Sequence, residues 1–140
     1  MKRTKKTIVT DWARRGEEAG QVASVAQGYR LNIILAEKVM GWTFKAYGNG
    51  GGEFQQDGKT VAHLYSWTPI STWAQAQQVA ETWRLKEGTN RWWDLTSPRA
   101  PGSYWGVRFV DGVKRHKIVH DVTAEKAICE ALAMVLGEQP

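Results

Sequence analysis

Three segments of the chain carry apolar side chains at the spacing of an α-helix. They are residues 29–40, 72–87 and 123–136. A glycine follows each segment and predicts its C-terminal end, at Gly41, Gly88 and Gly137. Thr72 and Thr123 stand at the expected N-cap positions of the second and third segments. The pattern therefore predicts three amphipathic helices spread along the chain.

Runs of alternating apolar and polar residues lie between these helices and predict five strands. The runs are residues 42–47, 61–67, 91–95, 104–110 and 113–120. The glycine-rich stretch Gly48–Lys59 joins the first two and is interpreted as a turn or flexible loop. Such a stretch can hold phosphate where it leads into a helix, but this one leads into a strand and lacks the GK[ST] ending, which favours a plain hairpin loop.

The order of elements favours an α+β fold. Short hairpins predict a largely antiparallel sheet of about five strands, covered by the three helices as an α-β-α sandwich. We expect one domain over residues 30–140. Residues 1–29 have a broken apolar pattern interrupted by glycines, and we expect a basic N-terminal arm, helical or disordered, that contacts a neighbouring subunit or nothing.

The pair Asp111-Gly112 separates two alternating runs, which is a strong signal for a β-hairpin with a two-residue turn. This turn would pair Val110 with Val113 and would place Arg108 directly opposite Arg115. Like charges at directly opposed positions repel by a few tenths to about 1 kcal/mol, so compensation is expected from a carboxylate or a bound anion. The alternative is a solvated face on which the two side chains splay apart.

The predicted hairpin divides its side chains between two faces. One face would hold Tyr104, Arg108, Arg115 and Lys117. The other would point into the core and would hold Trp105, Val107, Phe109 and Ile118. Because paired guanidinium groups suit phosphate, the first face is a candidate anion site.

Neighbouring residues extend this candidate site. Trp92 and Trp93 are adjacent on a predicted strand and should point to opposite faces, so one is expected in the core and the other available. Arg91 and Arg99 flank them around the proline-rich loop 96–103. An exposed tryptophan beside arginine can stack a base and hold its phosphate, although an aromatic residue at the edge of the core is the simpler interpretation.

Composition sets wider limits. The 140-residue chain has a net charge of +5 and a pI near 9.5, which favours an anionic partner, although four of the excess charges lie in the first six residues.

No apolar run is long enough to cross a membrane, and the single cysteine, Cys129, fits a reducing cytoplasm. His116 and His120 on one strand would lie about 13 Å apart, too far to share a metal ion. We therefore expect no metal, no cofactor and no enzyme activity.

Four sets of residues match a known pattern: Ala36–Trp42, Tyr65-Ser66 with Ser71–Trp83, Ala127–Cys129, and Ala131-Leu132. Through these residues the chain resembles the phage ABA sandwich domain family. The resemblance begins near Leu31 and ends near Gly137. It implies an α/β sandwich encoded by phages or prophages, and it supplies no catalytic residues that could be transferred.

Three functions remain open from the sequence. The first is a non-enzymatic protein, expected to be homo-oligomeric, that sequesters a nucleotide-type ligand in the host cytoplasm and so counters a bacterial defence. The second is an inhibitor that binds a host defence enzyme through the same tryptophan and arginine side chains. The third is a nucleic-acid-binding accessory protein that uses the basic tail and the hairpin.

Overall fold

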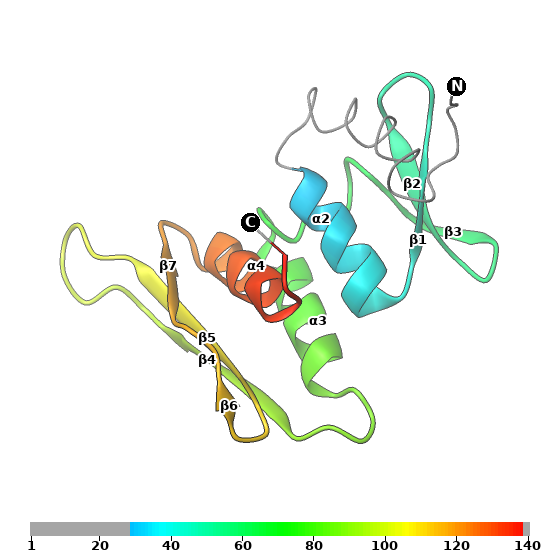
Figure 1. Ribbon diagram of the computed structural model, residues 1–140. Helices are drawn as coiled ribbons and strands as arrows, with labels where there is room; N and C mark the ends of the chain where they lie inside the picture. The colour runs from blue at the N-terminus through cyan, green and yellow to red at the C-terminus, as the bar shows by residue number, and fades with distance from the viewer. Residues whose placement is uncertain (1–28, 139–140) are drawn as a thin grey trace. The chain divides into compact units, whose positions relative to one another are not determined.

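The computed structural model describes residues 29–138, which divide between Thr68 and Pro69 into two compact units. These residues form helices and two antiparallel sheets, so the predicted α+β class is confirmed (Figure 1). The strands build a three-stranded and a four-stranded sheet rather than the single sheet we expected. The predicted arm, apart from Tyr29, lies outside the described residues.

The first unit begins with a helix that ends where the glycine predicted. Helix α2 spans Tyr29–Leu35 and continues as a π-helical segment, η1, over Ala36–Met40. Gly41 follows with φ of 74°, and its N–H donates to the carbonyl of Ala36. Glycine adopts the left-handed backbone conformation at little energetic cost, so the helix ends at this residue.

The sheet of the first unit contains β1 (Thr43–Ala46), β2 (Gly52–Gln56) and β3 (Lys59–His63) in that order. The loop predicted over Gly48–Lys59 is therefore wrong over Gly52–Gln56, which forms β2. Asp57 and Gly58 make the turn into β3 with φ of 54° and 77°. Positive φ at both central residues is what a tight Asp-Gly hairpin requires. The strand predicted over 61–67 ends at His63.

One face of this sheet is apolar. Phe44 lies directly opposite Phe54, and their ring centroids are 5.4 Å apart. Trp67 meets Phe54 edge-on at 5.5 Å and also contacts Trp42 at 5.0 Å. These four aromatic side chains form much of the core of the first unit, since Phe44, Phe54 and Trp67 are all buried.

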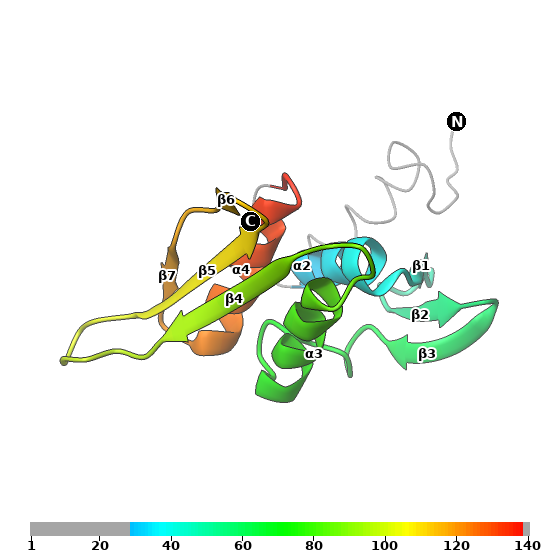
Figure 2. The ribbon, with the colours of Figure 1, turned by 90° about the horizontal axis from the view of Figure 1, so that it is seen from below.

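The second unit holds two helices and four strands. The helices are α3 (Trp73–Arg84) and α4 (Ala124–Val135), and the strands are β4 (Arg91–Thr96), β5 (Trp105–Asp111), β6 (Lys114–Arg115) and β7 (Val119–Asp121). Strand β5 is central: β4 pairs with one side of it, and β6 and β7 pair with the other. Helix α4 packs on β5 and β7 and also against α3, so the helices cover one face of this sheet (Figures 1 and 2).

Local signals explain the ends of these helices. The Thr123 hydroxyl accepts a hydrogen bond from the backbone N–H of Lys126 at 3.2 Å, as the N-cap prediction requires. Thr72 stands at the N-cap position of α3 but makes no side-chain cap hydrogen bond there. Helix α3 ends at Arg84, short of Gly88, which instead takes up φ of 80° in the following loop.

Alternate residues of β4 and β5 point to opposite sides of the sheet. The helix face carries Trp93, Val107 and Phe109, and the Trp83 ring of α3 meets Phe109 edge-on at 5.1 Å. We call the opposite side the outer face. It carries Trp92, Asp94, Thr96, Gly106, Arg108 and Val110, together with Arg115 and His120 from the paired strands.

Candidate functional site

The β5–β6 hairpin exists, but its predicted register is wrong. Asp111 pairs with Lys114 and Val110 pairs with Arg115, so the turn residues are Gly112 and Val113 rather than Asp111 and Gly112. Gly112 has φ of 64°, and glycine at the first turn position is one of the two favoured two-residue solutions. Asp111 stays in β5, where its carboxylate lies 3.3 Å from the guanidinium of Arg91 on β4.

Arg108 therefore does not face Arg115 directly. The residue directly opposite Arg108 is Asp94 on β4, and Nη2 of Arg108 lies 3.4 Å from Oδ2 of Asp94. Arg115 shares the outer face but is displaced along the sheet, opposite Val110. The repulsion expected between two facing arginines is absent, and a carboxylate already offsets part of the charge of Arg108.

The Arg108 side chain is only partly satisfied. Its Nε is buried and makes no hydrogen bond to any residue in the range 29–138. Its guanidinium carbon lies 5.9 Å from the ring centre of Trp92, a distance that permits a cation–π interaction. Trp92 is itself 40% exposed. The outer face thus presents an aromatic surface beside a partly exposed cationic group, one donor of which is buried and unused.

The adjacent pair Trp92 and Trp93 divides between the two faces, as the alternation predicted. Trp93 stacks on Phe109 at 5.9 Å, and its indole N–H donates to Oε2 of Glu81 at 2.8 Å. Arg84 also binds Glu81, and the hydrogen bonds from Arg84 first and Trp93 second lower the pKa of this carboxyl. Trp93 is accordingly a structural residue that ties β4 to α3.

Arg91 also turns to the helix face. Its guanidinium carbon lies 4.5 Å from the Trp83 ring centre, and its Nη1 donates to the Trp83 carbonyl at 3.2 Å. Together with the ion pair to Asp111, these contacts occupy the side chain. The structure therefore separates Arg91 and Trp93 from the group formed by Trp92, Arg108 and Arg115.

The remaining predicted residues lie around the outer face or beyond it. Tyr104 is 55% exposed and precedes β5, Arg99 is exposed in the β4–β5 loop, and Lys117 is exposed between β6 and β7. Ile118, predicted in the core, is 45% exposed, because the chain leaves regular strand geometry between β6 and β7 and the alternation no longer holds. Asp94 and His120 are outer-face residues that the sequence interpretation missed. The alignment of β4 with β5 would have revealed Asp94.

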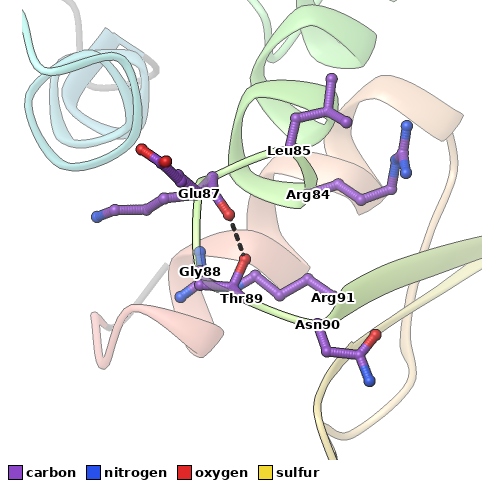
Figure 3. Close-up of a pocket in the computed structure, with 8 residues that line it drawn as sticks. Arg84, Leu85, Glu87, Gly88, Thr89, Asn90 and Arg91 are labelled. Carbon is purple, nitrogen blue, oxygen red and sulfur yellow. Dashed lines mark hydrogen bonds between the residues drawn. The ribbon is translucent and has the colours of Figure 1, made fainter.

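A hollow of about 400 Å³ lies at the α3–β4 connection and is lined by residues 84–91 (Figure 3). The loop is held by the Thr89 hydroxyl, which donates to the carbonyl of Lys86 at 2.6 Å. Two of its three cations are already engaged, Arg84 with Glu81 and Arg91 with Asp111. The hollow is thus a poor candidate for an anion compared with the outer face.

A polar cluster on the first unit surrounds Glu53. Tyr47 donates to one carboxylate oxygen at 2.6 Å, and Gln55 and Thr60 donate to the other. Hydrogen bonds from Gln55, Thr60 and Tyr47, in that order, lower the pKa of Glu53 to about 2. A carboxylate held ionised in this way is unsuited to act as a general acid near neutral pH.

Three further observations limit the chemistry and the setting of the described residues. Burial raises the pKa of the Cys129 thiol, which disfavours the reactive thiolate. Within residues 29–138, no three histidine, cysteine, aspartate or glutamate side chains gather closely enough to hold a metal ion. In the same part of the chain, no helix is long and apolar enough to cross a membrane.

Comparison with known proteins gives the relationship. A crystal structure of a phage protein from Bacillus cereus ATCC 14579 is similar in fold, with a TM-score of 0.54 and 22% sequence identity. The match covers 81% of this chain and 91% of that one. A search of curated proteins found no match. The sequence profile of the phage ABA sandwich domain matches residues 33–132, and the chain belongs to this family.

Proposed function

We propose that this chain is a non-enzymatic binding protein of a phage and that it acts on a component of the bacterial host cytoplasm. It binds through the outer face of the second sheet, formed by β4, β5, β6 and β7. The observation that carries the proposal is the pairing of a half-exposed Trp92 with Arg108, whose buried Nε has no partner among the described residues. A buried donor without an acceptor is costly, so the Arg108 side chain loses little when it turns toward an acceptor on a bound partner.

A host protein, such as a defence enzyme, is the partner that this surface fits best. Tryptophan, tyrosine and arginine dominate the binding energy of protein interfaces, and Trp92, Tyr104 and Arg108 are of these types. Asp94 beside Arg108 adds a carboxylate, so the face offers both signs of charge. A mixed face of this kind suits a protein surface better than a polyanion.

A nucleotide-type ligand, sequestered to blunt a host defence signal, is the second candidate. The exposed part of the Arg108 guanidinium and the displaced Arg115 would hold phosphate, and Trp92 would stack on a base. Asp94 counts against this candidate because its charge repels phosphate. Nucleic-acid binding is less favoured, since much of the excess positive charge lies in residues 1–28, outside the described part of the chain.

Site-specific photocrosslinking tests the proposal. A benzophenone amino acid would replace Trp92 in one variant and Trp73 in the other, because the two tryptophans are 40% and 41% exposed but lie on β4 and α3. In host cells, the Trp92 variant should give a discrete crosslink to one host protein, and the Trp73 variant should not. The same crosslinked species from both variants, or none from either, contradicts the proposal.

A thermal-shift screen with nucleotides separates the second candidate. If the ligand is a nucleotide, one compound should raise the melting temperature, and Arg108→Ala should abolish the shift while Lys117→Ala retains most of it. A shift that survives Arg108→Ala would place the ligand elsewhere. Oligonucleotide binding that weakens steeply as salt rises would instead favour nucleic acid.

A further inference from the structure

Strand β4 forms an unpaired edge of the second sheet (Figure 2). It pairs with β5 over all six of its residues in continuous register, and no other strand among the described residues pairs with it. Every second N–H and carbonyl of an edge strand points away from its neighbour. This row of groups is a ready template for another strand.

The edge lacks the features that usually prevent such pairing. Proteins protect edges with proline, bulges, lysine or very short strands. The sequence RWWDLT contains no proline and no lysine, its register has no bulge, and it is six residues long. Its two charged side chains are already engaged, Arg91 with Asp111 and Asp94 with Arg108.

We infer that β4 pairs antiparallel with β4 of a second copy. The two strands are related by a twofold axis that passes midway between the two Trp92 residues. The twofold axis of such a pair is perpendicular to the sheet, so directly opposed residues lie on the same face. One residue of β4 must therefore lie opposite its own copy, and that residue is the centre of the register. A register centred on Asp94 would oppose two carboxylates and is unfavourable.

Two registers centre on a tryptophan, and the contacts separate them. A register centred on Trp93 would place each Asp94 opposite a Trp92 ring. The residues next to the axis would be the two Trp93 side chains, which are already stacked on Phe109. A register centred on Trp92 sets the exposed indole beside its own mate on the outer face, where the ring surfaces turned away from the sheet stay open to a further partner. It also sets Arg91 opposite Trp93, a cation against an aromatic ring, and Asp94 opposite Asn90, an acceptor against a donor.

The pairing would join the four-stranded sheets of the two copies into one continuous sheet, with α3 and α4 of both copies on the same face. The outer faces of the two copies would then merge, so the partner copy contributes a second Arg108 and Arg115 to the surface. This inference is independent of the proposed function, because the dimer could form whether or not the outer face binds a host protein.

Native mass spectrometry and disulfide trapping test the inference. The wild-type chain of 15.8 kDa should give a species of twice that mass. Trp92→Cys should form an intermolecular disulfide under mild oxidation, because opposed Cα atoms lie about 4.5–5.5 Å apart, within reach of a disulfide. Cys129 is buried and does not compete.

Thr96→Cys is the matched control. Thr96 is exposed on the same face of the same strand, but its mate would lie about 26 Å away along the strands, so it should not crosslink. The double variant Asn90→Cys/Asp94→Cys retains Trp92 and should crosslink as well. A monomeric wild-type mass overturns the inference. So does a dimer in which neither Trp92→Cys nor the double variant crosslinks, or in which Thr96→Cys crosslinks equally.

Discussion

Arg108 and Asp94 face each other across β5 and β4, with Nη2 and Oδ2 separated by 3.4 Å. The distance is long for a charge-assisted hydrogen bond, which is usually 2.7–2.9 Å. The pair therefore offsets part of the arginine charge without using the whole guanidinium. Its Nε is buried and left without a partner in residues 29–138, so an incoming acceptor meets the exposed part of the guanidinium, which can turn toward it at little cost.

Asp94→Asn should change the free energy of unfolding by less than about 1 kcal/mol, because partly exposed ion pairs contribute little. The two side chains are 29% and 45% exposed. Urea denaturation of the variant and the wild type measures the difference. A loss greater than about 2 kcal/mol would mean that the pair holds the sheet together and is not available to a partner.

Trp93→Phe should cost about 1 kcal/mol of stability. The substitution keeps an aromatic ring on Phe109 but removes the indole donor of the 2.8 Å hydrogen bond to Glu81. Hydrogen bonds to charged acceptors contribute more than those between neutral groups, but Glu81 is partly exposed, so the loss stays close to that of a neutral hydrogen bond. Trp92→Phe is the control and should change stability by less than about 0.5 kcal/mol. Equal losses in the two variants would contradict a specific role for Glu81.

Gly52→Ala should destabilise the first unit by about 2 kcal/mol or more through overpacking. A Cβ at this position would lie 2.5 Å from the Phe44 ring and 2.8 Å from the carbonyl of Lys45. Gly48→Ala is the matched control, since a Cβ there meets nothing within 4 Å and its φ is not in the left-handed region. Thermal unfolding of both variants checks the difference, and a stable Gly52→Ala would contradict the close packing of β1 on β2.

The free energy of unfolding should fall as pH rises through neutrality, because Glu130 loses a proton that it holds in the folded chain. Burial first, and then the hydrogen bond to Asp121, raise the pKa of Glu130 from 4.5 to about 7. The folded chain thus keeps a proton that the unfolded chain has released. The contribution of Glu130 is complete below pH 4.5 and is lost as pH rises through about 7.

The pKa of the partner carboxyl, Asp121, shifts in the other direction. The hydrogen bond from Glu130 is the first cause that lowers the pKa of Asp121 below 3.8, so its contribution is lost only in more acidic solution. Glu130→Gln keeps a donor and cannot titrate. The melting temperature of this variant should fall less than that of the wild type between about pH 5 and about pH 8. Identical pH profiles would contradict the shared proton.

The helices were predictable because their signals are local. Gly41 ends the first helix in the left-handed conformation, and Thr123 caps the last one, as the sequence indicated. The alternation of Trp92 and Trp93 was also predictable, since adjacent residues of a strand always point to opposite faces. The strand Gly52–Gln56 was missed although Asp57-Gly58 carries the same turn signal as Asp111-Gly112.

The hairpin register was not predictable from the hairpin alone. Both Asp111-Gly112 and Gly112-Val113 are acceptable two-residue turns. The observed turn occurs together with contacts to residues about twenty positions earlier in the chain. Arg91 binds Asp111, and the carbonyl of Asn90 accepts a hydrogen bond from the Gly112 N–H at 2.7 Å. The same alignment brings Asp94 to Arg108, so the chemistry of the candidate site depended on a pairing that the local sequence does not encode.

The central claim is that the outer face of the second sheet is the binding surface. The most direct measurement is the affinity of purified variants for the host protein captured by crosslinking at position 92. Trp92→Ala should weaken binding at least about tenfold, as truncation of an interface hot spot does, while Trp73→Ala should leave it unchanged. Equal affinities for wild type and Trp92→Ala, or a larger loss in Trp73→Ala, would contradict the account.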